Sequence, residues 1–361
     1  MSDVSLFAPT HLGSRALRNR LVMAPMTRSR ATPDGVPTPI MAEYYGQRAE
    51  AGLIVTEGTS PSPNGRGYAR IPGIWSQAQE TGWRQVTSAV HAKGGVIFLQ
   101  LMHTGRVSHA LNLPPGAEIL APSAVPLPGD MYTDSKGLQP HGAPRAMTDA
   151  EVRATAAEYV AAARRAIAAG FDGVELHGAN GYLMEQFLNP GTNLRQDDWG
   201  GPIENRVRFI LEVAHATSEA IGGERVGLRI SPHGAFNAMA PYSEVDETYR
   251  TLVKRLATTG VQYLHLLDHS AQGAPPVPEP LKGELRQLWP RTLILAGGFD
   301  RASAEAAVRE GRADLVAVGR SFIANPDLVT RFERGLPLAE LSPASLYTPG
   351  PAGYTDYPRA A

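Results

Sequence analysis

The chain has 361 residues, of which 43% are hydrophobic and 19% charged, and its formal net charge is −1 at pH 7. This length suits one large domain or two ordinary ones, and the near-zero charge provides no basic surface for nucleic acid or an anionic membrane. Cysteine is absent, which excludes disulfides, thiolate catalysis, cysteine-based zinc sites and cysteine-ligated iron–sulfur clusters.

The N-terminal residues 1–7 lack the charged and apolar regions of a signal peptide. No uninterrupted apolar run approaches the roughly 18 residues of a membrane span. We therefore expect a soluble, cytoplasmic protein that binds neither nucleic acid nor membrane.

Short apolar runs with β-forming residues return at intervals along the chain. They are near-continuous rather than alternating, as in parallel strands that are buried on both faces. We predict eight such strands, over residues 21–26, 53–58, 96–101, 173–178, 226–231, 263–268, 293–298 and 315–320.

Helical patterns lie between these runs, and three of them begin with residues that can form a capping box. The residue pairs concerned are Ser76 and Gln79, Thr148 and Glu151, and Ser243 and Asp246. Eight alternating strand and helix units predict an α/β protein with a (β/α)₈ TIM barrel, as a single domain over residues 1–361. A doubly wound open sheet is the structural alternative.

Three segments exceed what a minimal barrel needs. Residues 4–20 precede the first strand and suit an N-terminal cap that closes the barrel floor. Residues 103–147 follow the third strand, contain seven prolines and five glycines and lack a helical period, so we expect an irregular lid over the active face. The Pro-, Gly- and Tyr-rich tail, residues 342–361, is expected to fold back over the same face.

In a TIM barrel the active site forms at the C-terminal ends of the strands. Gly297 and Gly298 stand at the seventh end, and Gly319 and Arg320 stand at the eighth. Glycine backbone N–H groups can approach an anion, Arg320 can add a bidentate charge, and residues 321–324 can form a short helix pointing inward. This pattern predicts a phosphate site, and tight turns that need glycine for positive φ are the alternative.

Two polar residues, Gln100 and Arg229, fall on strands that should be buried, so each needs a partner. Beside a phosphate, an amide and a guanidinium suit a flat heterocycle, and flavin mononucleotide (FMN) fits. The alternative is a buried ion pair of Arg229 with Glu57 or Asp268. No G-x-G-x-x-G follows a strand, so a nicotinamide cofactor would have to enter the same open site.

The fourth predicted strand ends in a turn that carries His177, Asn180 and Tyr182. Histidine and asparagine can donate hydrogen bonds to an electronegative atom, and tyrosine can deliver a proton. The trio is a candidate for binding and protonating a polarised substrate, with plain structural hydrogen bonding as the alternative. His265 and His269 are four residues apart, but that spacing aligns side chains only on a helix, so we predict no metal site.

Several separated motifs resemble those of Old Yellow Enzymes, which are flavin-dependent ene-reductases. The matching segments are residues 19–28, 100–101, 103–106, 177–186, 228–232, 296–299, 318–328 and 353–358. The resemblance implies an NADPH-dependent FMN oxidoreductase that reduces the activated C=C bond of α,β-unsaturated carbonyl or nitro compounds. Thr27, in place of a cysteine, resembles the classical branch of the family.

The resemblance also assigns roles to individual residues. Those that would bind FMN are Pro25, Met26, Thr27, Gly58, Gln100, Arg229, Gly298, Phe299, Gly319 and Arg320. Those that would line the substrate pocket beside His177 and Asn180 are Tyr68, Met102 and Tyr347. Many relatives have tryptophan at the position of Met102, so we expect an altered pocket shape and stereochemical preference with the same reaction.

In the implied mechanism, NADPH reduces the bound flavin and leaves, and the alkene takes its place. Hydrogen bonds from His177 and Asn180 draw electron density toward the substrate oxygen and make the β-carbon electrophilic. Hydride passes from flavin N5 to that carbon, and Tyr182 protonates the α-carbon. A phenol with an ordinary pKa of about 10 stays protonated at neutral pH and can serve as this acid.

Two other functions are weighed against this one. A flavin-free, phosphate-binding lyase or isomerase would need a lysine or paired carboxylates at the strand ends, and the sequence places neither there. A non-catalytic binding barrel would not need Tyr182 beside His177 and Asn180. We expect small-molecule partners and a monomer or homodimer.

Overall fold

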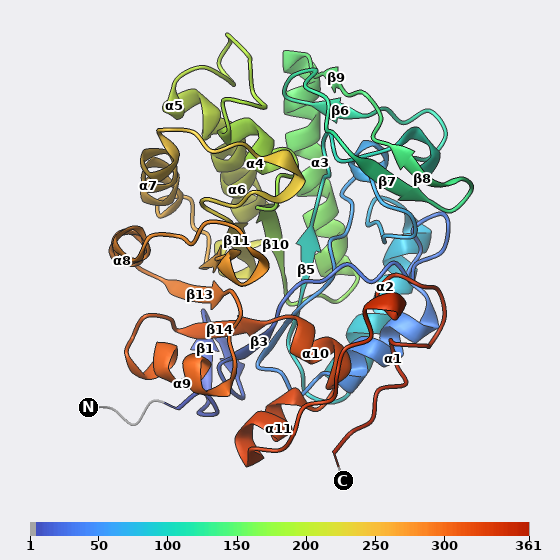
Figure 1. Cartoon of the computed structure of the whole chain (residues 1–361), viewed down its shortest axis with the longest axis vertical. Helices are drawn as coiled ribbons and strands as arrows, with labels where there is room; N and C mark the ends of the chain where they lie inside the picture. The colour runs from blue at the N-terminus through green and yellow to red at the C-terminus, as the bar shows by residue number, and fades with distance from the viewer. Residues whose placement is uncertain (1–4, 361) are drawn as a thin grey trace.

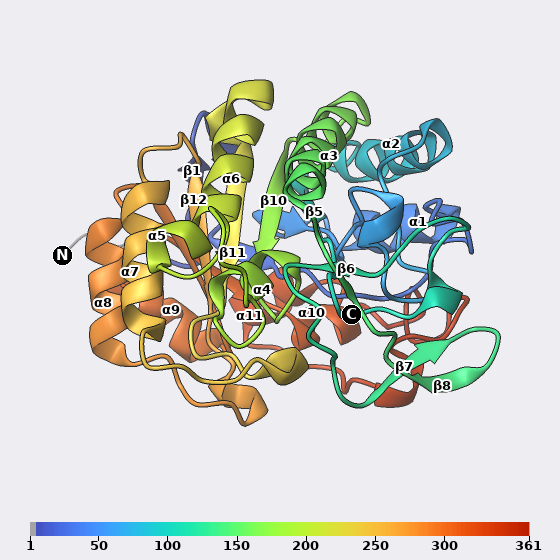
Figure 2. The same ribbon diagram turned by 90° about the horizontal axis from the view of Figure 1, so that it is seen from above.

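The computed structural model describes residues 5–360, so residues 1–4 and 361, at the ends of the predicted cap and tail, lie outside it. Eight parallel strands form a closed barrel with helices around its outside (Figures 1 and 2). They are β3 (Leu21–Met23), β4 (Leu53–Val55), β5 (Ile97–Leu101), β10 (Gly173–Gly178), β11 (Val226–Ile230), β12 (Tyr263–Leu267), β13 (Thr292–Ala296) and β14 (Leu315–Val318). The predicted TIM barrel is confirmed, and the open sheet is excluded because β14 pairs with β3 and closes the ring.

The helices that surround the barrel follow the strands in sequence. They are α1 (Pro39–Gln47), α2 (Gln77–His91), α3 (Asp149–Ala168), α4 (Leu183–Leu188), α5 (Ile203–Arg206), α6 (Arg208–Ile221), α7 (Val245–Leu256), α8 (Glu279–Leu288), α9 (Arg301–Arg309), α10 (Arg320–Ala324) and α11 (Leu328–Arg334). Among residues 5–360, no helix combines the length and the hydrophobicity that crossing a bilayer requires.

Two of the three predicted capping boxes are present. The side chains of Ser76 and Thr148 cap α2 and α3, each in a reciprocal box with the residue three positions on. The third is wrong, because α7 begins after Glu244 and has no side-chain cap. Asp246, the predicted partner of Ser243, instead lies with its Oδ1 2.7 Å from Nε2 of His233.

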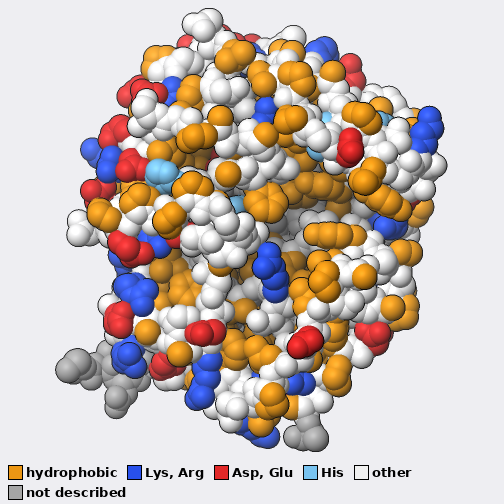
Figure 3. Space-filling model, viewed as in Figure 1, with side chains coloured by type: hydrophobic (Ala, Val, Ile, Leu, Met, Phe, Trp, Pro, Cys, Tyr) orange, Lys and Arg blue, Asp and Glu red, His pale blue; other side chains and the backbone are white. Residues whose placement is uncertain are grey.

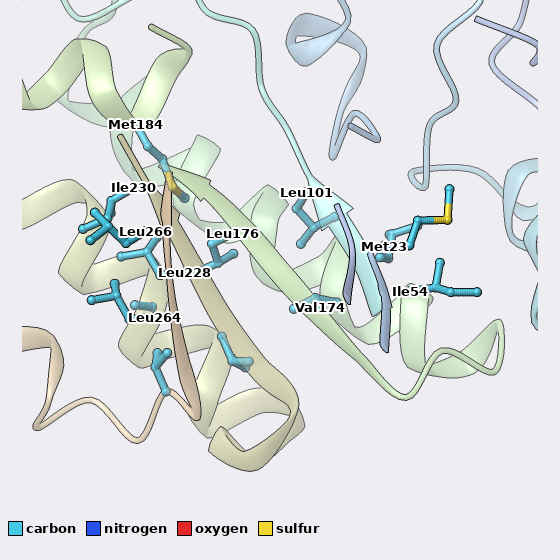
Figure 4. Packing of buried hydrophobic residues seen from close by; sticks show 14 of the residues in the cluster. Met23, Ile54, Leu101, Val174, Leu176, Met184, Leu228, Ile230, Leu264 and Leu266 are labelled. Atoms are coloured by element: carbon cyan, nitrogen blue, oxygen red, sulfur yellow. The ribbon is translucent and has the colours of Figure 1, made fainter. Parts of the chain in front are cut away.

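Side chains alternate between the two sides of each barrel strand. Those facing outward pack against the helices in one continuous core, which includes Ile54, Leu101, Val174 and Leu228 (Figure 4). Those facing inward form a second apolar cluster at the floor of the barrel. Apolar residues on both faces explain why the strands are near-continuous hydrophobic runs in the sequence.

An N-terminal hairpin closes the barrel floor. Its strands, β1 (Thr10–Leu12) and β2 (Arg15–Leu17), pair antiparallel. Leu12 and Leu17 are fully buried against the inward-facing cluster of the barrel. The hairpin is the predicted N-terminal cap.

Residues 103–147 are more regular than predicted. They contain η2 (Ala110–Asn112), a parallel pair of β6 (Leu120–Ala121) with β9 (Arg145–Ala146), and an antiparallel pair of β7 (Asp130–Thr133) with β8 (Gly137–Pro140). The short alternation of buried Met131 and Thr133 with exposed neighbours is a strand signal that the surrounding prolines obscure. A role as a lid stays a prediction.

Candidate functional site

A cavity of about 610 Å³ opens at the C-terminal end of the barrel. The face drawn in Figure 1 is hollowed near its centre, where that figure draws the barrel strands (Figure 3). The predicted site residues that line the cavity are Pro25, Met26, Thr27, Gly58, Gln100, Met102, His177, Asn180, Tyr182, Arg229, Gly298, Phe299, Gly319, Arg320 and Tyr347. Tyr68 is not among the lining residues, but its hydroxyl lies 3.1 Å from that of Tyr182. The volume falls within the usual range of ligand sites.

The turn after β10 is held by the loop that follows β11 and by α4. Asn180 has a φ of 61°, a left-handed conformation that asparagine tolerates better than most residues. Its backbone N–H donates to Oγ of Ser231 at 3.0 Å. The next N–H, of Gly181, donates to the Glu185 carboxylate at 2.6 Å, and Ser231 donates to the same carboxylate at 3.1 Å. These bonds fix the turn and leave the Asn180 side chain facing the cavity.

His177 is a neutral hydrogen-bond donor. The backbone N–H of Ala179 donates to its Nδ1 at 3.3 Å, so the ring proton is on Nε2. Burial, followed by the charge of Arg229, holds the pKa of His177 well below its ordinary value of 6.5. At neutral pH the ring therefore offers one N–H without carrying a positive charge.

Tyr182 is a buried phenol at the start of α4. Burial raises its pKa above the ordinary value of 10, and burial also raises that of its neighbour Tyr68. The Tyr182 ring meets the ring of His177 edge-on, with centroids 4.9 Å apart. Tyr182 therefore keeps its proton through the neutral range and can act as an acid.

Beneath the cavity, the carboxylate of Glu175, on β10, contacts residues from two other strands, β5 and β12. It accepts hydrogen bonds from Nε2 of Gln100 at 2.8 Å and from the hydroxyl of Tyr263 at 3.1 Å, and Nδ1 of His265 lies 2.8 Å away. Strand register creates this meeting, because Glu175 stands opposite Gln100 in the ladder. With its amide nitrogen engaged, Gln100 keeps its carbonyl oxygen for a donor in the cavity.

Arg229 has no ion-pair partner among residues 5–360, and its Nε is buried without a hydrogen bond. The ion pairs of Arg229 with Glu57 or Asp268, considered from the sequence, are wrong. The Glu57 carboxylate accepts the backbone N–H groups of Arg28 and Ser29, and Asp268 pairs with Lys282. Burial lowers the pKa of Arg229, and the charge of Glu175 opposes that shift.

The turns predicted to form the phosphate site are partly as expected. Gly297 and Gly298 have φ values of 141° and 71°, and a Cβ on Gly297 would lie 2.5 Å from the carbonyl oxygen of Asp268. The predicted short helix is present as α10, directly after Gly319. Gly319 itself does not have a positive φ, so its small size serves close approach: a Cβ there would lie 3.3 Å from Sδ of Met26.

Sequence reasoning misses part of the cavity wall. Phe236, Gln272, Leu338 and Leu341 line it, and they come from loops and from the segment that follows α11. Phe236 and Gln272 follow strands β11 and β12, so a search of whole loops after strand ends could find them. Leu338 and Leu341 lie after the last strand and carry no such signal.

Comparison with known proteins gives a consistent result. The model of the NADH:flavin oxidoreductase / NADH oxidase family matches residues 5–339. Chanoclavine-I aldehyde reductase of Penicillium roqueforti is 42% identical, over 98% of this chain and 95% of its own. The "Probable flavin mononucleotide-dependent alkene reductase" of Leishmania infantum is also 42% identical, over 99% of this chain and 97% of its own.

Among solved structures, morphinone reductase superposes with a TM-score of 0.95 at 45% identity, and the match covers 99% of this chain and 97% of that one. A structure of morphinone reductase in complex with tetrahydroNAD superposes with a TM-score of 0.93. Family match, identity and fold agree over nearly the whole length. The chain belongs to the NADH:flavin oxidoreductase family, that is, to the Old Yellow Enzymes.

Proposed function

We propose that the protein is an FMN-dependent ene-reductase that reduces the activated C=C bond of α,β-unsaturated carbonyl and nitro compounds with NADPH. The observation that carries the proposal is the pair of neutral donors, His177 and Asn180, beside the protonated phenol of Tyr182 on one cavity wall. Membership of a flavin oxidoreductase family supports the cofactor class. The partners we propose are small activated alkenes, bound by a monomer or homodimer.

The cavity has the features that FMN requires. Arg229 offers a buried cation with no partner in the described part of the chain, and Gln100 offers an amide held by Glu175. Both would hold the pyrimidine side of the ring, with Thr27 at its C4 oxygen. The remaining residues proposed to bind FMN pack around the ring or hold the phosphate: Pro25, Met26, Gly58, Gly298, Phe299, Gly319 and Arg320.

When bound, FMN would accept hydride from the nicotinamide and supply it to the alkene. The protein's own part is to hold and polarise the substrate. Nε2–H of His177 and the side-chain amide of Asn180 would donate to the substrate oxygen, stabilising the charge that develops there as hydride adds to the β-carbon. Tyr182 would give its hydroxyl proton to the α-carbon, and Tyr68, Met102 and Tyr347 would shape the pocket.

A nicotinamide donor is supported by the morphinone reductase complex with tetrahydroNAD, at 46% identity. The family description names NADH, whereas the resemblance to Old Yellow Enzymes as a whole implies NADPH. We propose NADPH, and a comparison of flavin reduction rates with the two nucleotides tests this choice.

The function is tested by anaerobic spectroscopy of the purified protein. A yellow protein that bleaches with NADPH and recovers its colour with cyclohexenone is the expected result, because each half-reaction changes the flavin spectrum. A colourless protein that FMN cannot reconstitute would overturn the flavin assignment and favour a phosphate-binding barrel. A protein that bleaches but is not reoxidised by enones or nitroalkenes would overturn the substrate class alone.

A further inference from the structure

A second cavity, of about 490 Å³, shares no lining residue with the cavity at the barrel mouth. It lies between the start of α2, the loop of residues 33–36, the residues around η2 and the turn between β7 and β8. Arg66 lines it, together with the carboxylates of Asp34 and Asp134 and the apolar groups of Trp75, Leu111, Pro114 and Pro115. Nothing in the proposed ene-reductase mechanism uses this cavity.

Arg66 is unusual among the buried arginines. Eight arginines are buried in the part of the chain that the structure describes, and six of them donate hydrogen bonds to carbonyl or side-chain oxygens. The two without any partner are Arg229 and Arg66, each 5% exposed with a buried, unsatisfied Nε. A buried charge without a partner is costly. Arg229 faces the proposed flavin cavity, and Arg66 faces this one.

The acidic residues of the second cavity do not neutralise Arg66. Asp134 is already paired with Arg70. Asp34 is exposed and is not within ion-pair distance of Arg66, although its charge partly offsets the lowering of the Arg66 pKa by burial. Water screens an exposed carboxylate far better than it screens a buried guanidinium. The guanidinium of Arg66 is therefore a cation without a compensating charge among residues 5–360, and an anionic ligand would supply that charge.

The backbone around Arg66 is closely packed. A Cβ on Gly65 would lie 2.7 Å from Oγ of Ser60, and one on Gly67 would clash with the carbonyl oxygen of Val107. Nδ2 of Asn112 also donates to the Gly67 carbonyl at 3.0 Å. These contacts hold Arg66 in place before any ligand arrives, which lowers the entropic cost of binding.

We propose that this cavity binds a small monocarboxylate with an apolar body. The carboxylate of the ligand would accept two charge-assisted hydrogen bonds from the guanidinium of Arg66, the bidentate geometry that arginine favours. The body would lie against Trp75 and the prolines at 114 and 115. The proposal stands apart from the proposed flavin chemistry, because its residues belong to a different cavity.

The test is calorimetric titration of the FMN-loaded protein with phenylacetate and with neutral phenylacetamide. Phenylacetate is expected to bind saturably and at least about tenfold more tightly than the amide, since one charge-assisted bond is worth about that factor. Equal affinities, or no saturable binding of phenylacetate, would overturn the proposal without any variant.

Two variants locate the site. Arg66→Met keeps an unbranched apolar side chain and removes the charged guanidinium, so phenylacetate affinity should fall by about tenfold or more. His177→Ala removes a donor from the barrel mouth and should leave the affinity unchanged. The reverse pattern, or a change in the flavin spectrum on adding phenylacetate to the wild type, would place the anion at the barrel mouth and overturn the proposal.

A stability readout guards against misfolding of the variant. Removing a buried, unpaired charge should leave the melting temperature of Arg66→Met equal or higher, and phenylacetate should raise the melting temperature of the wild type only. If the methionine variant unfolds, Trp75→Ala, which keeps the charge of Arg66, replaces it as the test. Weaker phenylacetate binding by Trp75→Ala would then support the proposal. Unchanged binding would show that Arg66 has only a structural role and that the assignment is wrong.

Discussion

The two ends of the barrel are built from the same eight strands and finished in opposite ways. At the floor, Leu12 and Leu17 of the hairpin seal the lumen against Leu53 and Phe98, and all four side chains are buried. At the mouth, Nε of Arg229 and Oδ1 of Asn180 have no hydrogen-bond partner within residues 5–360. One end contributes stability, and the other keeps polar groups available for a ligand.

Between these ends lies a middle layer, in which the carboxylate of Glu175 satisfies several polar groups while Nε2 of His265 is buried without a partner in the described chain. Glu175 accepts from Gln100 and Tyr263 and contacts His265, all within the lumen. These side chains are almost completely buried, and only Gln100 reaches the cavity, so the role of Glu175 is to orient the groups above it. At the mouth, by contrast, the unpartnered atoms of Arg229 and Asn180 belong to side chains that line a cavity a ligand can enter.

The largest effect is expected at the mouth. Tyr182→Phe keeps the ring and removes the proton donor, so reoxidation of the reduced enzyme by cyclohexenone should slow by about 10²- to 10⁴-fold. Stopped-flow absorbance measures this step separately from flavin reduction by NADPH, which should change little. Reoxidation within threefold of the wild type would show that another group supplies the proton.

At the floor, the expected effect is on stability. Leu12→Ala should lower the free energy of unfolding by about 2–5 kcal/mol, because it leaves a cavity in a fully buried cluster. Chemical denaturation measures it, with the half-exposed Leu338→Ala at the mouth as the control, for which about 0.5 kcal/mol or less is expected. Equal effects at the two positions would contradict the contrast between the ends.

Residues of the middle layer should affect the reduction potential of the flavin and not the proton transfer from Tyr182. Glu175→Gln removes a negative charge near Arg229 while keeping the side-chain shape, so the reduced, more negative flavin should be favoured. We expect the two-electron reduction potential to rise by about 30 mV, equivalent to a tenfold change in the equilibrium. Spectroelectrochemistry measures the potential, and an unchanged value would restrict Glu175 to packing.

The smallest effect concerns the carboxylate under the turn. Burial raises the pKa of Glu185 to about 7 from an ordinary value of 4.5, so the native state binds this proton more tightly than the unfolded state. The resulting stabilisation is present below pH 4.5 and is lost as the pH rises through 7. The melting temperature should therefore fall more between pH 5 and pH 8 in the wild type than in Glu185→Gln. A pH dependence that is the same in both proteins would show that Glu185 ionises normally.

Local signals predict the frame of this protein well. All eight barrel strands follow from their apolar runs, although four of them end at least two residues earlier than predicted: β3 at Met23, β4 at Val55, β13 at Ala296 and β14 at Val318. The sequence beyond these points leaves the ladder to build the mouth. The site residues predicted at strand ends line one cavity for the same reason, because strand ends converge in a closed barrel.

Contacts between distant segments account for what sequence reasoning misses. Glu175 meets Gln100 and His265 only through strand register, which no local pattern of residues reveals. The capping box at Ser243 fails because Asp246 meets His233, thirteen residues earlier. Arg66 is recognised only when burial and the absence of a partner are both known.

The central claim is that hydride reaches the β-carbon from the nicotinamide by way of FMN, while Tyr182 delivers a solvent-derived proton to the α-carbon. Mass spectrometry and NMR of the product from 2-methylcyclohexenone test it most directly, with C4-deuterated NADPH in one reaction and D₂O in another. We predict nicotinamide deuterium at the β-carbon, solvent deuterium at the α-carbon, and loss of turnover in Tyr182→Phe. Reversed positions of the two labels, or full turnover without the Tyr182 hydroxyl, would contradict this account.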